Sequence, residues 1–473
     1  MSEQPPLLAN ATRDLAAFAA ELRYDDIPSE VIAHIKLCIL DGIGAGLYGA
    51  HLPWTKIVRR VATAEGTAPK ASMWGTGQKV SVAQAALVNS TAGHGFEMDD
   101  IHKESILHPN SLAVPATFAW AQGGNHPVDG RDLLTAIVAG CEVGIRIGNA
   151  ATMSLFLRGF HPQGTNGVFV SAAACGRLVK LAPTQMQNAL GIAGSMAAGL
   201  MAAQEGAMVK RLHAGRAAQG GVQAVQLARE GFTGIGDVVE AGYGGFLSSF
   251  SAKPNAARLA DGLGRIWETG KIGFKMYPNV TSIHSALDGF AALLAEQKLA
   301  AADIDAVEIE CPHMTYVHTA WPYAAGSVTA AQMNMFYGIA AMAVAGRVSA
   351  GEYAERALAD PRVVAFIPRI RVTESAELEA KGAEYRHASR VRVRTRGGQA
   401  FERETLHRRG SPENPVGRTD VVQKFLGNVR HLPAAAQERI IQLIDTLDTG
   451  GSFGELSDIL GAEHHTTAEK SAN

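Results

Sequence analysis

The chain has little of the residues and motifs that mark several common classes of protein. Its four cysteines are Cys38, Cys141, Cys175 and Cys311, which are far apart and form no C-x-x-C pair. Each lies in an apolar context, as a small buried hydrophobic residue does, so we expect structural thiols in a cytoplasmic protein. Such spacing also argues against an iron–sulfur cluster, because a cluster needs several thiolates that converge.

Charged residues are also scarce. They make up 19% of the chain, hydrophobic residues make up 47%, and the formal net charge is −2 with no long basic or acidic block. Nucleic acid and membranes are therefore poor candidates as partners. No apolar run approaches the ~18 residues of a membrane span, and no secretory signal is visible at the start. The low charge indicates a large buried fraction or an oligomer, and we expect a homodimer with a mainly helical interface.

Signatures of bound nucleotides and of catalytic zinc are missing as well. The sequence contains no G-x-x-x-x-G-K-[ST] and no H-E-x-x-H, and no G-x-G-x-x-G follows a predicted strand. We therefore expect acid–base and electrostatic chemistry, with no metal and no cofactor.

Most of the chain has the pattern of a helical protein. From about residue 12 to 260, Ala-rich segments carry apolar residues at helical spacing, with Gly or Pro between them. A helix is predicted to begin at Pro28-Ser29-Glu30, and its glycine-rich tail would let another helix approach closely. Residues 189–206 are small and apolar nearly all round, which predicts a helix buried on every side.

The pattern changes between about residues 266 and 405. Apolar and polar residues alternate there in three predicted strand regions, 304–312, 366–374 and 389–406. Gly397-Gly398 indicates a hairpin within the last region. We predict a mainly α fold, with a large all-helical domain and a smaller α+β lid domain. The predicted bounds are 1–265 for the helical domain, completed by 411–460, then 266–410 for the lid and 461–473 for a disordered tail.

The segment from His94 to Pro115 has the highest density of titratable side chains next to an apolar run. It contains Glu97, Asp99, Asp100, His102, Lys103, Glu104 and His108 within twelve residues. Carboxylates and histidines that lie close together shift each other's pKa and can transfer protons. The alternative is a polar loop that joins two helices.

Two further motifs carry histidine and lysine. In GFHPQGTNG, residues 159–167, a turn before a helix presents backbone N–H groups that suit a carboxylate, although a capped loop is an equal alternative. In MVKRLHAGRAAQGG, residues 208–221, Lys210 and His213 share a helix face beside buried-looking segments. A lysine that faces a core needs an anionic partner, such as a substrate; the alternative is a solvated basic face.

Lys275 and Tyr337 stand out in the second half. Lys275 lies in GFKMYP, where the helical pattern gives way to the predicted lid, and clefts between domains commonly bind ligands. Tyr337 lies in the apolar segment AAQMNMFYGIAAMAVAG, residues 330–346. It is either a core residue with a bonded hydroxyl or a phenolic proton donor.

Taken in this order, the motifs resemble those of the MmgE/PrpD family. The corresponding segments are EMDDIHKESILHP, HPQGTNG, KRLHAGRAA, KMYP and AQMNMFY. The family includes 2-methylcitrate dehydratase, cis-aconitate decarboxylase and iminodisuccinate epimerase. The resemblance implies a helical domain, an α+β lid, a homodimer and a cofactor-free site between the domains. Many members carry D-F-D-D-T where this chain has Glu97 to Ile101, so an acid one methylene longer replaces the first Asp and the Thr hydroxyl is absent.

The resemblance also implies a set of site residues. The catalytic set is His108, His161, Lys210, Lys275, Tyr337 and Asp99. The substrate-binding set is Asp100, His102, Gly164, Thr165, Arg211 and His213. The family's substrates are small polycarboxylates, whose charge Lys210 and Lys275 can neutralise while a histidine moves a proton.

Our first hypothesis is a metal-independent lyase that acts on a small tricarboxylate by His/Lys acid–base catalysis. The second is an epimerase of a dicarboxylate such as iminodisuccinate, which needs the same acid–base groups. The third, from another class, is a non-catalytic carboxylate-binding helical protein. The sequence leaves open which histidine is the acid and which is the base.

Overall fold

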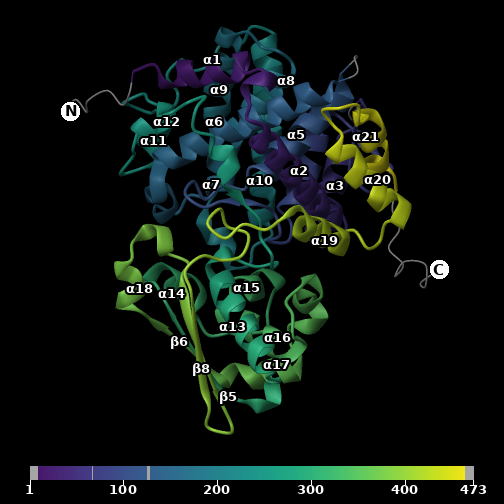
Figure 1. Cartoon of the computed structure of the whole chain (residues 1–473). Coiled ribbons are helices and arrows are strands. Elements are labelled where there is room, and N and C mark those ends of the chain that lie inside the picture. Colours follow the sequence, from purple (N-terminus) through teal and green to yellow (C-terminus); the bar gives the residue numbers. More distant parts are fainter. Residues whose placement is uncertain (1–8, 67, 125–127, 464–473) are drawn as a thin grey trace.

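The computed structural model describes residues 9–66, 68–124 and 128–463. Figure 1 shows a large helical body and a smaller part that holds a β-sheet. We call residues 280–405 the sheet part and the other described residues the helical body. The predicted fold class, mainly α with a smaller α+β region, is confirmed. The predicted tail, 461–473, lies almost entirely outside the described residues.

The helical body is built from the following elements. Before the sheet part the helices are α1 (Ala11–Glu21), α2 (Ser29–Gly49), α3 (Pro53–Ala64), α4 (Val82–Gly93), α5 (Asn110–Gly123), α6 (Gly130–Leu157), α7 (Pro162–Thr165), α8 (Gly167–Leu178), α9 (Pro183–Gly194), α10 (Val209–Arg229), α11 (Phe246–Phe250) and α12 (Ala257–Ala260). The short strands are β1 (Ala71–Ser72), β2 (Lys79–Val80), β3 (Ile101–His102) and β4 (Ile272–Gly273). After the sheet part come α19 (Arg418–Asn428), α20 (Ala434–Asp445) and α21 (Phe453–Gly461).

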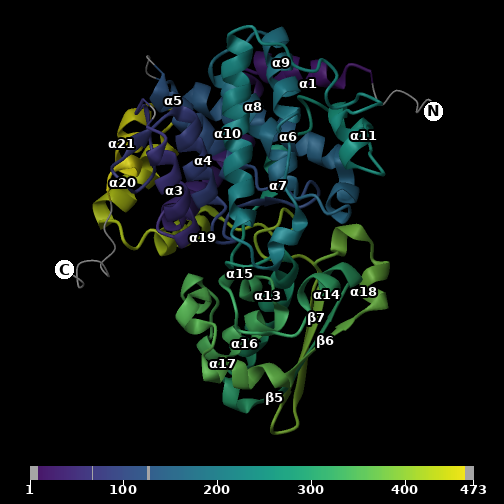
Figure 2. The same ribbon diagram turned by 180° about the vertical axis from the view of Figure 1, so that it is seen from behind.

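Close helix packing forms the core of the body. Figure 2 shows α10 running alongside α8, and α8 in turn packs against α6. The predicted helix after Pro28 is α2, and its glycines let neighbours approach as expected. A Cβ on Gly49 would lie 1.9 Å from the carbonyl oxygen of Ala92 in α4, and one on Gly44 would lie 3.0 Å from the ring of Phe425 in α19. Segments from both ends of the chain therefore pack on α2.

Two helices, α2 and α6, are long and apolar enough to cross a membrane by length and composition. The apolar window of α6 is 100% buried inside the protein and that of α2 is 72% buried. Such burial is typical of core helices in a globular fold. All four cysteines are free and buried, as predicted.

The sheet part has its own hydrophobic cluster. Its helices are α13 (His284–Gln297), α14 (His313–Thr319), α15 (Val328–Gln332), α16 (Met335–Ala345), α17 (Pro361–Phe366) and α18 (Ala376–Ala380). Its strands, β5 (Ile304–Cys311), β6 (Ile370–Glu374), β7 (Ser389–Thr395) and β8 (Ala400–Thr405), lie in the order β6-β5-β7-β8. β5 and β6 are parallel and the other pairs are antiparallel. The three predicted strand regions and the hairpin after β7 are thereby confirmed.

Two segments of small or apolar residues do not form single helices. Residues 189–206 do not form one buried helix, because α9 ends at Gly194 and Leu200 beyond it is 62% exposed. Small residues suit a buried helix and a close-packed turn equally well, and composition does not separate them. The apolar segment 330–346 is divided between α15 and α16, because the Asn334 side chain accepts a hydrogen bond from the backbone N–H of Tyr337 and caps α16.

The segment around Glu97 joins the two parts. Phe96 and Met98 belong to the hydrophobic cluster of the sheet part, although they follow α4 of the body in sequence. The Phe96 carbonyl accepts a hydrogen bond from Gln332 at 2.9 Å, and the Met98 carbonyl accepts one from Lys424 at 2.5 Å. Glu97 is thus fixed from α15 on one side and from α19 on the other.

Candidate active site

A pocket with a volume of about 100 Å³ is lined by side chains from both parts of the molecule. This size suits a small organic acid and is small for a nucleotide or a drug-sized ligand. Its titratable lining residues are Glu97, Lys103, His108, His161, Lys210, Lys275, His318, Arg386, His387 and Arg408. Among the described residues, five cationic side chains thus line the pocket against one carboxylate. Such a pocket attracts anions that carry several charges.

Glu97 forms ion pairs with three cations, of which Lys210 and Lys275 line the pocket. Its Oε1 accepts hydrogen bonds from Lys210 and Arg211, and its Oε2 accepts one from Lys275 at 2.9 Å. Burial acts to raise the pKa of Glu97, but Lys210, Lys275 and Arg211 outweigh burial and hold it well below its usual range. The carboxylate therefore stays ionised and balances one charge of the three.

The backbone of Glu97 is strained. Its φ is +56°, in the left-handed region that residues with a Cβ rarely adopt. Such strain persists when the surroundings fix the segment, and it is concentrated at functional sites. Here the ion pairs of Glu97 and the anchored neighbours Phe96 and Met98 fix it.

A chain of histidines lies beside this carboxylate. His94 donates from Nδ1 to Asp99 Oδ2 at 2.7 Å, and its ring is 5.0 Å from the ring of His108 and 5.7 Å from that of His161. His161 and His213 share a hydrogen bond of 2.8 Å between their Nδ1 atoms. His108 and His161 line the pocket, whereas His213 lines a separate groove at the surface of α10. This row of histidines thus connects the pocket with a second surface.

Two motifs that are far apart in the sequence orient His108. Its Nδ1 donates to the carbonyl oxygen of Asp100 at 2.6 Å, so in the neutral ring Nε2 is the basic nitrogen. Gln163, from HPQGTNG, accepts from the His108 backbone N–H at 2.9 Å and donates to the His108 carbonyl at 3.1 Å. Asp100 in turn accepts from Asn110 at the start of α5. This network leaves His108 one orientation.

Burial keeps the pocket histidines neutral. It lowers the pKa of His108 to about 3, even though Asp99 acts to raise it. It also lowers the pKa of His161 well below 6.5, and nearby His94 and Lys210 lower it further. The negative charge of a bound polyanion would offset the nearby positive charge, and it would raise the pKa values of His108 and His161 toward neutrality. The site would therefore be tuned for proton transfer when its ligand is bound.

Lys210 is the lysine with the most perturbed titration in the pocket. Burial lowers its pKa from 10.5 to about 8, while Glu97 acts to raise it and Arg211 to lower it further. The ammonium group is still mostly protonated at neutral pH. It loses its charge within the range of an ordinary alkaline assay.

His94, Asp99 and His108 are the group that could approach a metal ion among the described residues, since one ligand atom from each lies within 4.8 Å of the others. In this group Asp99 and both Nδ1 atoms already have hydrogen-bond partners: the Nδ1 atoms of His94 and His108 make hydrogen bonds of 2.7 Å and 2.6 Å, to Asp99 and to a backbone carbonyl. A metal held through these atoms would have to replace those bonds. The arrangement is that of a hydrogen-bond network that orients two imidazoles.

The structure brings four of the predicted catalytic residues together and supports them with others. His108, His161, Lys210 and Lys275 line the pocket. Asp99 and His213 contact the pocket histidines, as described above. Arg211, which is 1% exposed, binds Glu97 and also donates to Gln332 at 3.2 Å, so it supports the site without lining it.

Three predicted substrate contacts are corrected to structural roles. Asp100 is 1% exposed and bonds Asn110, and burial raises its pKa well above the usual range. Thr165 donates to the carbonyl of His161 at 3.1 Å. His102 bonds Ser105 at 2.9 Å and Glu268 at 3.2 Å. None of the three lines the pocket.

Two further predicted site residues lie away from the pocket lining. Gly164 is not an anion-binding helix start, because its N–H donates to the His161 carbonyl at 3.0 Å and a Cβ there would lie 2.1 Å from Ala198. Tyr337 is not at the pocket: it is 0% exposed in the core of the sheet part, and its hydroxyl donates to the carbonyls of Glu352 and Ala357. The sequence around a tyrosine in an apolar helix is the same whether the tyrosine is a core residue or a proton donor.

Several pocket residues were not predicted. His94, which supports the pocket without lining it, was named only as the start of its segment, and Glu97 was named in the titratable cluster and as a departure from the family pattern but in neither set of site residues. His318, Arg386, His387 and Arg408 come from the sheet part and the segment after it. Burial lowers the pKa of His318 to about 4, and its Nε2 lies 3.0 Å from Gln204. These four residues stand in no local motif, so only the folded chain brings them to the pocket.

Comparison with known proteins gives a consistent result. Residues 13–258 match the model of the MmgE/PrpD N-terminal domain, and residues 277–449 match that of the MmgE/PrpD C-terminal domain. The chain is 30% identical over 478 residues to the cis-aconitate decarboxylase-like protein oryM of Aspergillus oryzae, which covers 96% of this chain and 98% of that protein. It is 30% identical to cis-aconitate decarboxylase of Aspergillus terreus over 440 residues, 88% of this chain and 89% of that enzyme. Human cis-aconitate decarboxylase is 26% identical over 457 residues, 93% of this chain and 92% of that enzyme. The protein belongs to the MmgE/PrpD family.

Proposed function

We propose that the protein is a metal-independent lyase that removes CO2 or water from a small tricarboxylate, and that cis-aconitate is the first substrate to test. The observation that carries the proposal is the charge of the pocket, where five cationic side chains face one carboxylate beside two neutral histidines. The names of the relatives from Aspergillus and human support the choice of substrate.

The reaction requires cations that stabilise negative charge and a group that transfers a proton. In a decarboxylation of this type, the C–C bond to one carboxylate breaks and CO2 leaves. The electron pair moves through the double bond toward a second carboxylate, and a proton adds to the carbon next to that carboxylate. Lys210 and Lys275 would stabilise the extra negative charge on the second carboxylate, in the way that fixed cations stabilise transition states. Loss of water needs the same cations: a base removes a proton from the carbon next to the carboxylate, the electron pair forms the double bond, and an acid protonates the hydroxyl group, which leaves as water.

We assign proton delivery to His161. Its Nδ1 shares a hydrogen bond with Nδ1 of His213, which lines the groove on the far side. Each decarboxylation consumes one proton, and His213 offers a route by which His161 regains it. His108, whose Nδ1 is committed to a backbone carbonyl, keeps a basic Nε2 and is the better proton acceptor.

The test is incubation of the purified protein in deuterated buffer with cis-aconitate, 2-methylcitrate and iminodisuccinate, followed by proton NMR. We expect CO2 or water loss from a tricarboxylate, and loss of CO2 would place deuterium at one carbon of the product. Inversion of a dicarboxylate without loss of a group would instead identify an epimerase. Binding of a tricarboxylate without turnover or exchange would identify a non-catalytic carboxylate-binding protein.

The same assay tests metal independence. We expect full activity after treatment with EDTA and gel filtration, because Lys210 and Lys275 already supply the cations that the proposed reaction needs. Loss of activity with EDTA and recovery with one divalent metal would contradict this part of the proposal.

We also propose that the protein is a homodimer. Met196 is 38% exposed, Leu200 62% and Val209 46%, and all three line one groove beside α10. Apolar groups that cluster on a surface commonly mark an interface. Light scattering at micromolar concentration should give the mass of two chains, and the mass of one chain would refute the proposal.

A further inference from the structure

Two guanidinium groups in the pocket lack a carboxylate partner. Arg386 and Arg408 line the pocket, and among the described residues no carboxylate lies within 4.0 Å of either. The nearest acids are engaged elsewhere. Glu413 pairs with Lys103 at 2.9 Å, and Asp288 accepts from Tyr277 at 2.8 Å and from the backbone N–H of Arg409 at 2.7 Å.

Backbone contacts hold both groups in place. Arg408 donates from Nη1 to the carbonyl of Phe274 at 2.5 Å, and Arg386 donates from Nη2 to the carbonyl of Lys103. An arginine carries more N–H donors than these bonds use. The chain also leaves room for Arg408, since a Cβ on Gly273 would lie 2.9 Å from its Nη2.

Burial makes this arrangement costly without an anion. Arg408 is 4% exposed, and burial lowers its pKa to about 10, so it remains charged at neutral pH. A buried charge without a counter-ion destabilises a fold, and an anion that binds there removes the cost. His387 lies within electrostatic reach of both arginines and of Lys103, and burial together with these cations keeps it neutral. It therefore adds a polar group without adding charge.

We propose that Arg386 and Arg408 form a second carboxylate subsite, which binds the carboxylate that distinguishes a tricarboxylate from a dicarboxylate. The inference rests on the proposed function, in which Lys210 and Lys275 bind the carboxylate that gains charge in the reaction. Glu97 already forms ion pairs with those lysines, whereas no carboxylate among the described residues forms an ion pair with Arg386 or Arg408. The arginines therefore select substrates by their number of carboxylates.

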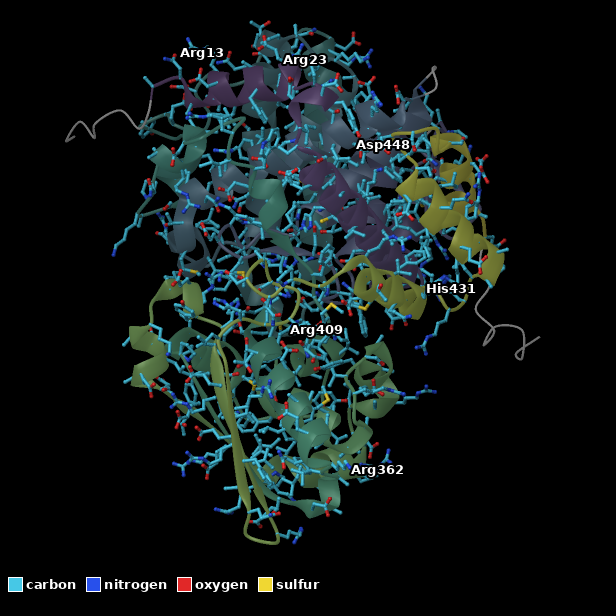
Figure 3. All side chains as sticks on the ribbon, viewed as in Figure 1. Arg13, Arg23, Arg362, Arg409, His431 and Asp448 are labelled. Atoms are coloured by element: carbon cyan, nitrogen blue, oxygen red, sulfur yellow. The ribbon has the colours of Figure 1, made fainter. Side chains whose placement is uncertain are left out.

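The test uses two ligands that differ by one carboxylate, propane-1,2,3-tricarboxylate and methylsuccinate (propane-1,2-dicarboxylate). Their Kd values are measured by calorimetry on the wild type, Arg408→Gln, Arg408→Lys and Arg386→Gln. Arg409→Gln is the matched control, because its guanidinium is half-exposed and pairs with Asp420. Figure 3 labels Arg409 at the junction of the body and the sheet part.

We expect the wild type and Arg409→Gln to bind the tricarboxylate at least about tenfold more tightly than methylsuccinate, in line with a charge-assisted contact. Arg408→Gln and Arg386→Gln should each reduce this ratio to within about threefold while the Kd of methylsuccinate stays unchanged, and Arg408→Lys should restore part of it. If Arg408→Gln fails to fold by circular dichroism, the half-buried Arg386→Gln decides the outcome.

Other outcomes overturn the subsite. An equal loss of affinity for both ligands in the Gln variants would show that the arginines act only through the backbone they hold. A preference that survives in both Gln variants would place the third carboxylate elsewhere. In both cases turnover of a tricarboxylate would leave the proposed function standing. Failure of the wild type to bind either ligand, without turnover, would refute the subsite and the proposed function together.

Discussion

The two groups of charges in the pocket differ in how they are paired. In the first group, which we call the acid–base group, Glu97, His108, His161, Lys210 and Lys275 are connected to one another and to supporting residues by hydrogen bonds or ion pairs. In the second, the arginine group, Arg386 and Arg408 contact backbone carbonyls and no carboxylate among the described residues. The lysines of the acid–base group have a carboxylate partner inside the protein, whereas the arginines would gain one only when an anionic ligand binds.

This difference separates chemistry from recognition. Groups that move protons need fixed orientation and tuned pKa values, and a dense network supplies both. Groups that bind an anion act most strongly where no internal counter-ion competes. The acid–base group should therefore tolerate few changes for any substrate, and changes in the arginine group should alter which substrate binds. The predictions below test this contrast, from the largest expected effect to the smallest.

Loss of an acid–base residue should have the largest effect. Lys210→Ala and His161→Ala should each lower kcat/KM at least ~100-fold, as expected when a charge-stabilising or proton-transfer group is removed. Lys180→Ala and His313→Ala are controls, since both side chains are more than half exposed. Steady-state kinetics with the substrate identified by NMR would show the effect. Near wild-type values in both pocket variants would mean that the acid–base group is assigned wrongly.

The second prediction concerns the alkaline side of the pH profile. Protonated Lys210 is the active form, and its pKa of about 8 means that raising the pH removes the cation. We expect kcat/KM of the wild type to fall about tenfold per pH unit above this value, while it stays level just below it. In Lys210→Arg the guanidinium remains charged, so any residual activity should lose this decline. A decline that persists unchanged in Lys210→Arg would assign it to another group.

The two groups also differ in how well they could be predicted from the sequence. Lys210, His161 and His108 were predicted because each lies in a short motif that resembles those of the family, although the residues that support them come from other motifs. Arg386 and Arg408 lie in segments whose neighbours on the chain carry no related chemistry, and their environment is set by the strand order and by the return of the chain toward Phe274. Long-range contacts of this kind leave no periodic signal.

The fold was easier to predict than the site for a related reason. Helical and alternating patterns report burial directly, so α2, β5 and the β7–β8 hairpin followed from local sequence. The error at residues 189–206 arose because small side chains do not distinguish a helix from a tight turn. The sequence did not show that Tyr337 lies in the core of the sheet part, because a bonded core hydroxyl and a proton donor have the same neighbours in sequence.

The third prediction tests how the acid–base group is held. Lys424 lies 2.6 Å from the buried Asp41 and also donates to the Met98 carbonyl, between Glu97 and Asp99. Lys424→Met should destabilise the protein by about 3 kcal/mol, because Asp41 loses its counter-ion, and it should lower kcat several-fold by loosening the Glu97 segment. In the double variant Asp41→Asn/Lys424→Met, urea unfolding should show recovered stability while kcat stays low. Recovery of both would mean that Lys424 does not position the segment.

The smallest effect is expected at Tyr337. Its hydroxyl donates to the carbonyls of Glu352 and Ala357 in the core of the sheet part. Tyr337→Phe keeps the ring and removes these bonds, so we expect a loss of stability of about 1 kcal/mol, as for an ordinary hydrogen bond, and kcat within twofold of the wild type. Phe290→Leu, another buried residue of the same cluster, should likewise change stability and not kcat. A loss of kcat of tenfold or more in Tyr337→Phe alone, with little loss of stability, would show that the tyrosine reaches the reacting groups in a conformation other than this one.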